Sequence, residues 1–208
     1  MTITWLGRSC FKITHNNYSI VIDPYRPCPS NGYKKFEATA NKVLVSHNHQ
    51  SHNYVQGVKI ENTSVECPFK IETIEVAHDY IKGAMRGMNL VHILTTEDGY
   101  KLVHLGDTGE MFEDERMNNP DVLMTNAGSL TALPSYECYV MAQQINPNVV
   151  IPMHMHHAPY GNRRYLGVND LLELYDDTIE AKYYEGNTIE ITKDTPRHFA
   201  VLKYIPIK

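Results

Sequence analysis

The chain has 208 residues, of which 42% are hydrophobic and 21% charged, and its formal net charge is −5 with histidine neutral. This composition is that of an ordinary globular protein, and the acidic balance, without a lysine or arginine run longer than two, argues against nucleic acid or an anionic membrane as the main partner. No apolar run approaches the ~18 residues that span a bilayer, the N-terminus lacks the pattern of a signal peptide, and the four cysteines are irregularly spaced, so we expect a reduced, cytoplasmic protein.

The first third of the chain predicts β-strands. Residues 2–7 and 9–15 alternate between apolar and polar side chains, and residues 18–24 form a near-continuous apolar run that ends at a proline. The sequence His-Asn-Asn at 15–17 has the chemistry of a hairpin turn between the second and third of these strands. Residues 24–35 are rich in proline, serine, asparagine and glycine and predict a loop.

The rest of the chain combines predicted strands with two predicted helices. Residues 89–107 predict two alternating strands joined by a Glu-Asp-Gly turn. Apolar residues recur at helical spacing over residues 135–145, with Ser135 as a candidate N-cap, and residues 168–177 predict a second helix, with Asn169 as a candidate cap. Further short apolar runs predict strands at 42–47, 65–67, 70–78, 121–125 and 148–154.

The organisation of the chain predicts one domain. We find neither an internal repeat at solenoid or propeller spacing nor a low-complexity linker. Strand runs precede each predicted helix, and residues with metal-binding chemistry fall at the ends of predicted strands. The simplest account is a single α/β domain, residues 1–208, with a large, mostly antiparallel or mixed sheet content.

Three of the eleven histidines fall within six residues, at His47, His49 and His52. Residues i and i+2 of an extended chain point to the same side, so the imidazoles of His47 and His49 can reach one ion, and His52 would approach from another side. Imidazole nitrogen suits zinc, whereas manganese requires added oxygen ligands. A lone histidine is more often a satisfied polar residue than a ligand, but three together, in a chain without His-rich low complexity, favour metal binding.

Other candidate ligands stand at the ends of separate predicted strands. Asp107 follows an apolar strand and precedes a glycine turn, where it would either bridge two ions or simply form the turn. His78 and His154 also end predicted strands. Turn preference explains one such residue but not His or Asp at the ends of four strands, so the pattern predicts a metal site assembled at strand ends.

Six linked motifs follow one another along nearly the whole chain: TITWLGRSCFKI, IVIDP, VLVSHNHQSHN, VAHD, HLGDTG and VVIPMH. In these motifs the sequence resembles the metallo-β-lactamase fold superfamily, and more narrowly its branch of small metal-dependent hydrolases that includes the L-ascorbate-6-phosphate lactonases. The first motif is similar to that branch's T-W-L-G-H-S-x-F-x-I, and the second to its I-x-I-D-P. The third stands in the place of V-L-x-T-H-x-H-x-D-H.

The resemblance implies a fold and a set of ligands. The fold would be a four-layer αββα sandwich with a metal site at one edge of its two sheets. Six side chains would hold two ions. His47, His49 and His78 would bind the first ion, His52 and His154 would bind the second, and Asp107 would bind both.

The resemblance also implies a mechanism. A water or hydroxide held between the ions would be the nucleophile, because bound metal lowers the pKa of water to about 7. Asp107, as the bridging ligand, is the candidate catalytic residue. Asp23, at its strand end, would orient a ligand without touching the ion.

Three positions depart from the family pattern. Ser51 replaces the Asp of H-x-H-x-D-H, Asn48 replaces an Asp that many members have after the first His, and Arg8 replaces the His of the opening motif. A serine hydroxyl is a poor ligand for a divalent cation, so the change at Ser51 should weaken the second site and leave the first intact. We therefore expect one tightly bound divalent ion, zinc being favoured over manganese or iron, and a second site that is weak or empty.

Basic residues near the predicted site allow an anionic substrate. Arg8 would place a fixed positive charge near the metal, or it is a surface arginine on a loop. Arg163 and Arg164, in a predicted loop, would either hold a phosphate or carboxylate or form a solvated pair. His156 shares a side with His154 if the strand continues, which makes it an outside candidate for a replacement ligand.

The residues and the resemblance together favour a metal-dependent hydrolase that uses a metal-activated water on an ester, lactone or phosphoester of a small molecule. The alternative is a non-catalytic or degenerate member of the same fold, which Ser51 and Asn48 favour. A nuclease is disfavoured by the acidic balance and the length, and we expect neither a nucleic-acid nor a membrane partner. The sequence specifies neither the substrate nor the oligomeric state.

Overall fold

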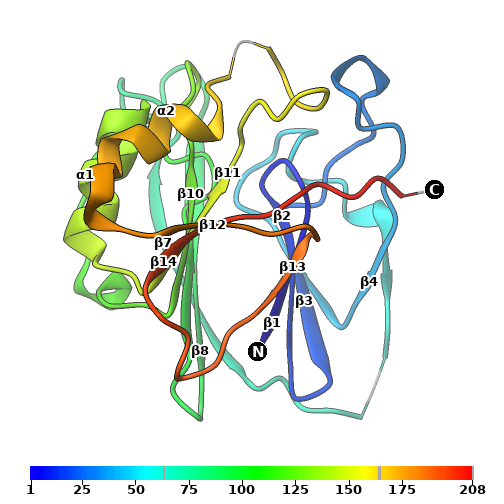
Figure 1. Cartoon of the computed structure of the whole chain (residues 1–208). Helices are drawn as coiled ribbons and strands as arrows, with labels where there is room; N and C mark the ends of the chain where they lie inside the picture. Colours follow the sequence, from blue (N-terminus) through cyan, green and yellow to red (C-terminus); the bar gives the residue numbers. More distant parts are fainter. Residues whose placement is uncertain (63, 164, 208) are drawn as a thin grey trace.

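Two β-sheets stack face to face in the computed structural model, which describes residues 1–62, 64–163 and 165–207, with the backbone alone at 176 and 177 (Figure 1). The strands are β1 (Thr2–Gly7), β2 (Cys10–His15), β3 (Tyr18–Ile22), β4 (Ala38–Ala40), β5 (Lys42–Leu44), β6 (Val58–Ile60), β7 (Phe69–Ala77), β8 (Met88–Thr96), β9 (Lys101–His104), β10 (Val122–Asn126), β11 (Val149–Met153), β12 (Ala181–Tyr183), β13 (Thr188–Glu190) and β14 (His198–Val201). The helices are α1 (Ser135–Ile145) and α2 (Val168–Leu172), with 3-10 turns at Pro29–Asn31, Val55–Gly57, Glu115–Met117 and Glu173–Thr178.

The five-stranded sheet has the order β13-β1-β2-β3-β5. Every second residue of β1 is buried, as its alternating sequence requires when one face of the sheet covers the core. Asn16 and Asn17 form the predicted turn between β2 and β3 with φ of 48° and 61°, a conformation that asparagine tolerates better than most residues. β5 runs parallel to β3, so both strands end at the same edge of the sheet.

The seven-stranded sheet is mixed, with the order β12-β14-β11-β10-β9-β8-β7. The strands from β12 to β9 run parallel to one another, and β8 and β7 complete the sheet as antiparallel neighbours. Every residue of β10 and β11 is buried, which explains their continuous apolar sequence. The predicted hairpin between β8 and β9 is confirmed, and Gly99 supplies the positive φ of 85° in its turn.

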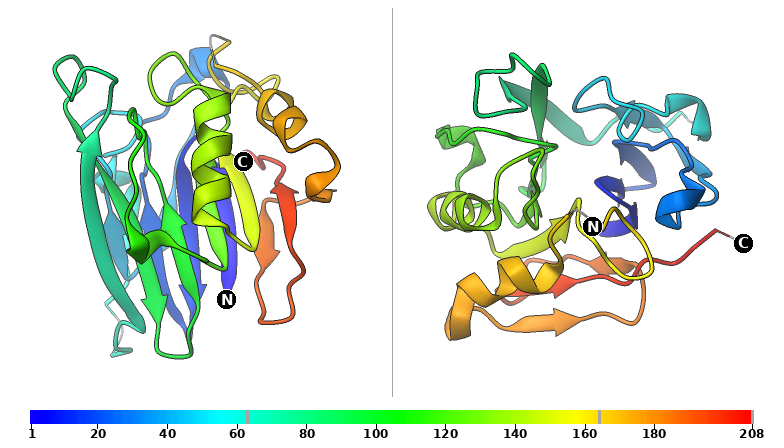
Figure 2. Two further views of the ribbon diagram at one scale, coloured as in Figure 1. Left: turned by 90° about the vertical axis from the view of Figure 1, so that its left-hand side faces the viewer. Right: turned by 90° about the horizontal axis from the view of Figure 1, so that it is seen from above.

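The two sheets and the helices form layers. α1 and α2 lie on the outer side of the seven-stranded sheet, where α1 contacts β10 and α2 (Figures 1 and 2). On the outer side of the five-stranded sheet the described chain has the paired strands β4 and β6 and short turns in place of long helices. This confirms the predicted α/β sandwich, with one outer layer reduced. None of the described helices is long and apolar enough to cross a membrane.

Two local predictions, at residues 65–67 and at Ser135, were wrong. Residues 65–67 form no strand, since proline follows them directly and leaves too short a run to pair. Helix α1 has the predicted bounds, but Pro134 is its N-cap. The hydroxyl of Ser135 instead donates to Ala127 O (2.6 Å), because that carbonyl is buried and needs a donor.

The second helix also differs from the prediction. The regular helix is only α2, and a 3-10 turn, Glu173–Thr178, takes over its second half. Asn169 lies inside the helix rather than at its cap. Gly167 is the N-cap, and its N–H donates to the carboxylate of Asp170 (2.7 Å), which satisfies one of the free donors of the first turn.

Five strands end at the same edge of the sandwich. β3 and β5 are parallel in one sheet, and β7, β9 and β11 share one direction in the other. In Figure 1 this is the upper edge, where the loops gather. The residues that follow these five strands include all the predicted metal ligands.

Candidate metal centre

A histidine-rich turn follows β5 and carries three imidazoles. The main chain bends twice there: His49 N donates to His47 O (3.0 Å), and His52 N donates to His49 O (2.8 Å). The bends bring the ring centroid of His47 to 4.5 Å from that of His49 and to 4.1 Å from that of His52. These side chains are thus gathered by a bent chain, and not by the extended chain that we expected.

His78 joins this group from the other sheet. Its ring centroid lies 4.5 Å from that of His47 and 5.1 Å from that of His49. One ring nitrogen of each of the three histidines lies within 4.8 Å of the others. Because His47 and His49 follow β5 and His78 follows β7, the group connects the two sheets.

The carboxylate of Asp107 lies among four of the histidines. Its Oδ2 is 3.2 Å from Nε2 of His52 and 3.3 Å from Nε2 of His154. The same oxygen is 3.6 Å from Nε2 of His78 and 3.9 Å from Nε2 of His47. One acidic oxygen is therefore shared between the three-histidine group and the pair formed by His52 and His154.

A tight turn after β9 places Asp107. The amide of Asn89 fixes this turn from the neighbouring strand, since its Oδ1 accepts the N–H of Asp107 (2.9 Å) and its Nδ2 donates to Leu105 O (2.9 Å). Gly106 has φ of 59°, and a Cβ there would collide with the side chain of Asn89. Asn89 is a positioning residue that the sequence pattern did not reveal, because it lies inside a predicted strand.

Asp23 contacts the histidine turn through its carboxylate. Its Oδ2 lies 2.8 Å from Nδ1 of His52, which leaves Nε2 of that ring directed to Asp107. Ser46 donates to Asp23 twice, from its N–H (2.7 Å) and from its hydroxyl (2.6 Å), and the same hydroxyl lies 2.9 Å from Nδ1 of His47. Asp23 thus contacts the ring of His52, and Ser46 links it to a second histidine, while its predicted role as the support of a metal ligand stays a prediction.

Charges at the centre are strongly coupled. Burial raises the pKa of the Asp23 carboxyl, but His52 and the Ser46 hydroxyl outweigh burial and bring that pKa to about 2. Burial lowers the pKa of His52, but Asp107 and Asp23 outweigh it and raise the pKa to about 10. The pKa of Asp107 lies well below its usual value, because His154 and His52 overcome the effect of burial. His52 is therefore an imidazolium between two carboxylates when no other cation is present.

The remaining histidines are neutral near pH 7. Burial, followed by the charge of His52, lowers the pKa of His47 to about 3. Burial likewise lowers the pKa of His154 to about 4, against the attraction of Asp107. The pKa values of His49 and His78 are also lowered, chiefly by burial. Neutral imidazole is the form that binds a metal ion.

Several of these polar atoms are buried without a hydrogen-bond partner. Nε2 of His47 and Oδ1 of Asp107 are in this state, and Nε2 of His52 has only its ion-pair contact with Asp107. Buried polar atoms are almost always satisfied, so such a group requires an explanation. Imidazole nitrogens and a carboxylate are the donors that zinc, manganese and iron take, and a divalent cation among them would satisfy all three atoms. The residues present therefore fit a metal ion.

Three residues at this edge have a left-handed backbone. Arg8, Asp23 and His154 have φ of 53°, 52° and 49°. For residues with a Cβ this conformation costs roughly 1 kcal/mol each, and such strain gathers at functional sites. Arg8 O accepts the N–H of His154 (3.3 Å) and Nε1 of Trp5 (2.9 Å), so the opening motif abuts the last predicted ligand.

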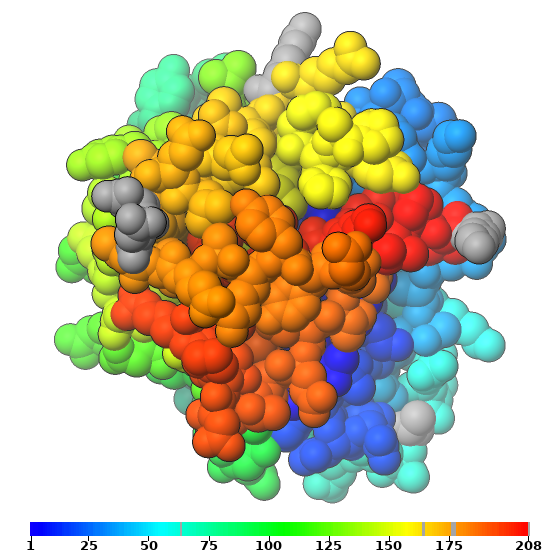
Figure 3. Space-filling view, viewed as in Figure 1, coloured from blue at the N-terminus to red at the C-terminus, as the bar shows by residue number. Residues whose placement is uncertain are grey.

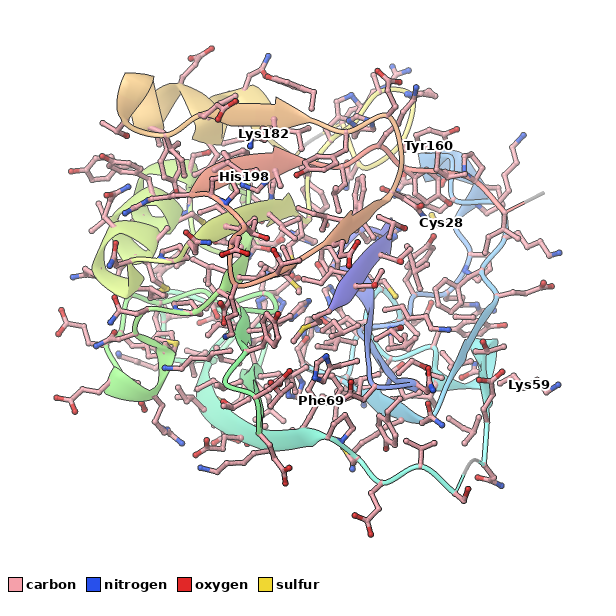
Figure 4. The ribbon with its side chains drawn as sticks, turned by 60° about the horizontal axis from the view of Figure 1, so that its bottom comes forward. Cys28, Lys59, Phe69, Tyr160, Lys182 and His198 are labelled. Carbon is pink, nitrogen blue, oxygen red and sulfur yellow. The ribbon has the colours of Figure 1, made fainter. Side chains whose placement is uncertain are left out.

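The guanidinium of Arg8 faces an aromatic wall. Its Cζ lies 5.1 Å from the ring centroid of Tyr33 and 5.7 Å from that of Tyr25, and its Nε is buried without a hydrogen-bond partner. The surrounding loops pack on one another, since Gly161 N donates to the loop that carries Cys28, close to Tyr160 (Figure 4). In Figure 3 residues 155–163 (yellow) and the C-terminal segment 203–207 (red) lie next to each other on the surface of the molecule.

The other predicted residues take different places. Ser51 is half-buried in the turn between His49 and His52. His156 donates its N–H to Leu166 O (2.9 Å), and its Nδ1 is buried without a partner, but it forms no described contact with the histidine groups. Arg163 is exposed, and Arg164 lies outside the described residues.

Two further residues border the centre and were not predicted. The ring of Tyr165 lies 4.4 Å from that of His154, and its pKa is raised by burial and by the charge of Asp107. Arg86, in the loop after His78, has a positive charge that contributes to the low pKa of that histidine. Both residues come from loops without a sequence pattern, so only the folded chain places them here.

Comparison with known proteins identifies the family. Residues 2–154 match the family model described as a beta-lactamase superfamily domain. The chain belongs to the β-lactamase superfamily. Its predicted membership of the metallo-β-lactamase fold is thereby confirmed, whereas its place in the branch of the ascorbate-6-phosphate lactonases stays a prediction.

Relatives extend this result. The chain is 26% identical to a UPF0173 metal-dependent hydrolase of Polaromonas sp. over 76% of this chain and 78% of that protein. It is 26% identical to one of Methanobrevibacter smithii over 76% and 83%. A solved structure from Thermotoga maritima, assigned by name to the Zn-dependent hydrolases of the metallo-β-lactamase superfamily, is 28% identical with a TM-score of 0.73 and covers 98% of this chain and 99% of that one.

Proposed function

We propose that this protein is a metal-dependent hydrolase that cleaves an ester, lactone or phosphoester of a small, anionic molecule with a metal-activated water. The observation that carries the proposal is the convergence of histidines from both sheets on one oxygen of Asp107, with buried donor atoms that lack partners. Relatives named as metal-dependent hydrolases support it. In this proposal residues 1–208 act as one unit, because the centre draws on both sheets.

Six residues would hold the metal. His47, His49 and His78 would bind a first ion, and His52, His154 and Asp107 a second, with Asp107 facing both. A bound divalent ion supplies a Lewis acid and lowers the pKa of a bound water to about 7. Zinc suits the imidazole-rich first group best, with manganese or iron as alternatives.

The protein's own groups prepare the reaction. Asp107 would orient the attacking water by accepting a hydrogen bond from it, because its second oxygen has no hydrogen-bond partner. Asp23 and Ser46 fix the orientations of His52 and His47, which a metal site requires as much as the ligands themselves. The low exposure of the centre keeps bulk water away from it.

The second ion would bind more weakly than the first. Ser51 offers no carboxylate, and His52 holds a proton that an ion would have to displace. An ion at the first group, His47, His49 and His78, displaces no proton, since these three histidines are neutral near pH 7. Ser51 also supports the alternative, a degenerate member that binds metal without efficient hydrolysis.

An anionic substrate is favoured by two arginines at the edge of the centre. Among the described residues neither Arg8 nor Arg86 forms an ion pair with a carboxylate. A substrate oxyanion could therefore pair with either one without breaking an existing ion pair. The motifs shared with the ascorbate-6-phosphate lactonase branch place phosphorylated lactones among the compounds to test. We place the protein in the cytoplasm, where its four free cysteines would stay reduced.

Hydrolysis and metal content test the proposal together. Protein purified without added metal would be analysed for zinc, manganese and iron and assayed on carboxylic esters, lactones and phosphoesters. We expect turnover on at least one class, and a loss of at least about a hundredfold in His47→Ala and Asp107→Asn, because each removes a ligand. His198→Gln is the matched control, because His198 (labelled in Figure 4) pairs with Val149 at the start of β11, whereas His154 follows the end of that strand. Bound metal without turnover on any class would favour the degenerate alternative.

A further inference from the structure

A cavity of about 380 Å³ lies beside the metal centre. It opens between the loop that follows His78 and the loop that precedes α1, which are neighbours at the upper edge of the left view in Figure 2. None of the six predicted metal ligands lines it, so it adjoins the metal centre without including it. Its chemistry is set by Tyr80, Met85, Arg86, Leu130 and Glu137.

The cavity shares main chain with the metal centre. Asp79 and Gly109 line it, the first directly after His78 and the second two residues after Asp107. Gly109 N donates to Ala77 O (2.9 Å), and a Cβ at Gly109 would collide with the main chain of His78 and Asp79. A ligand in the cavity would therefore lie against the two segments that position metal ligands.

The loop after His78 is held in one conformation. The carboxylate of Asp79 accepts four main-chain N–H groups, those of Ile81 (3.0 Å), Gly83 (2.9 Å), Met85 (3.0 Å) and Arg86 (2.8 Å). A cavity whose wall is already ordered costs a ligand little entropy on binding. The same bonds occupy both oxygens of Asp79, so its charge is compensated by N–H dipoles.

The rim of the cavity is unusually apolar. Tyr80, Met85 and Leu130 are 83%, 69% and 84% exposed. Large apolar side chains that gather in the open on two facing loops mark a binding groove rather than ordinary surface. An aryl or alkyl group between them would remove this surface from water.

The charges of the cavity differ from one end to the other. Arg86 is the sole cation among the described lining residues, is half-buried, and has no ion-pair partner there. It lies at the end next to the metal centre, since its main-chain N–H donates to the carboxylate of Asp79 (2.8 Å), the residue that follows His78. Glu137 lies at the opposite wall, on the first turn of α1, and disfavours a second anionic group there.

We propose that this cavity binds a small organic oxyanion with one apolar arm. The oxyanion, a phosphate, phosphonate or carboxylate, pairs with Arg86 at the end next to the metal centre, and the arm lies between Tyr80, Met85 and Leu130. The inference rests on the proposed function in one respect, because it takes such a molecule as the substrate of the hydrolase. It narrows that substrate to esters whose anionic end is close to the cleaved bond and whose remainder is apolar.

Binding of non-hydrolysable probes tests the cavity without turnover. Methyl-¹³C methionine labelling makes Met85 a reporter inside the cavity, and the buried Met117 and Met153 are internal references. Benzylphosphonate and phenylacetate, which have both an oxyanion and an apolar arm, would be titrated into the protein as purified and into the protein after chelation. Benzyl alcohol, which lacks the oxyanion, and methylphosphonate, which lacks the apolar arm, are the control compounds. We expect benzylphosphonate and phenylacetate to cause a saturable chemical-shift change at the Met85 methyl group in both preparations. Benzyl alcohol and methylphosphonate should bind at least about tenfold more weakly.

Two pairs of variants sharpen the test. Arg86→Gln should weaken benzylphosphonate binding at least about tenfold, whereas Lys82→Gln, which removes a charge from the same loop outside the cavity, should not. Leu130→Ser should weaken it as well, whereas Tyr136→Ser, an exposed aromatic outside the cavity, should not.

Three results would overturn the inference. One is equal binding in Arg86→Gln and Lys82→Gln, and another is binding that vanishes on chelation, which would place the oxyanion on the metal alone. The third is a Met85 shift that depends on protein concentration without ligand, which would make the apolar rim a contact between copies. An inactive enzyme that still binds the probes would count against the hydrolase and leave the cavity standing.

Discussion

In the motif that the sequence resembles, the position of Ser51 carries a carboxylate, and the two acids at the centre are already engaged. Asp23 is bonded to Ser46 and His52, and Asp107 faces four histidines. Nothing else among the described residues supplies the missing negative charge in the candidate metal groups. The number of tightly bound ions should therefore depend on this one position.

Restoring the acid should raise the metal content. In Ser51→Asp we expect a second ion to survive dialysis, so that bound metal rises from about one to about two equivalents per chain, because a carboxylate adds both a ligand and a charge. Gln50→Asp is the matched control, since it adds the same charge at an exposed position of the same turn. Elemental analysis of the three proteins decides the matter. Two equivalents in the unchanged protein would contradict the prediction.

The protonation of His52 predicts a pH dependence for the second ion. The pKa of His52 is raised to about 10, so it is protonated at pH 7, and an ion at its Nε2 must release that proton. Since a raised pKa means a more tightly held proton, second-site affinity should fall as pH falls, about tenfold per unit below pH 10. His47, with a pKa of about 3, is already neutral and releases none.

Calorimetry in two buffers of different ionisation enthalpy measures this release. A water bound to either ion can release a proton at pH 7 to 8, so the second equivalent of metal should release about one proton more than the first, the one held by His52. The variant His52→Gln should lose this additional release and keep the first phase. Additional proton release with the first equivalent instead would show that the two sites have been assigned the wrong way round.

At the scale of elements, the centre depends on how closely the loop after β9 packs on the end of β7. Gly109 is the point of contact, because its N–H donates to Ala77 O and there is no room for a Cβ against the main chain of His78 and Asp79. This contact sets the separation of His78 from Asp107, which come from different strands. A shift here would move one ligand relative to the other.

Gly109→Ala should therefore harm both stability and metal binding. Overpacking of this kind costs about 1–3 kcal/mol, and the displaced His78 should weaken the first ion at least about tenfold. Gly186→Ala is the control, since a Cβ there meets open space and the backbone has no positive φ. Denaturant unfolding and metal titration of both variants give the comparison. Unchanged metal affinity in a destabilised Gly109→Ala would show that the strand ends position His78 without this contact.

Elements and ligands were predictable from the sequence to different degrees. Residues 135–145 form α1 as predicted, and the hairpins at 15–18 and 96–100 are confirmed, because short-range patterns decide them. The six predicted ligands are brought together, since each follows a strand that ends at the same edge; their role as ligands stays a prediction. The predicted helix N-cap was wrong where tertiary packing gave the side chain another hydrogen-bond partner, as at Ser135. Arg86 and Tyr165 could not be foreseen, because loops without periodicity place them.

At the scale of the whole molecule, the centre joins two sheets that also meet through buried apolar side chains and through hydrogen bonds such as that of His104 Nε2 to Ser9 O (2.8 Å). His47 and His49 follow a strand of the five-stranded sheet, whereas His78, Asp107 and His154 follow strands of the seven-stranded one. Without a cation, the contact between the sheets at this edge consists of neutral imidazoles, some with unpartnered nitrogens, and the protonated His52 around one carboxylate. A bound ion would replace these unsatisfied contacts by bonds to both sheets, so it should stabilise the fold as well as support catalysis.

Metal removal should therefore lower the melting temperature. An ion present at a hundred times its dissociation constant stabilises the folded state by about 2.7 kcal/mol, and for a chain of this size each kcal/mol shifts the melting temperature by about 2–4 °C. We expect chelation to lower the melting temperature by about 5–10 °C, and readdition of zinc to restore it. His47→Ala should abolish the metal-dependent increment, because it removes a ligand from one sheet, whereas His198→Gln should retain it even if its own stability is lower. Calorimetry with and without chelator measures, for each protein, how much the metal raises the melting temperature. If the metal still raises the melting temperature of His47→Ala, the stabilising ion does not bridge the two sheets at this centre.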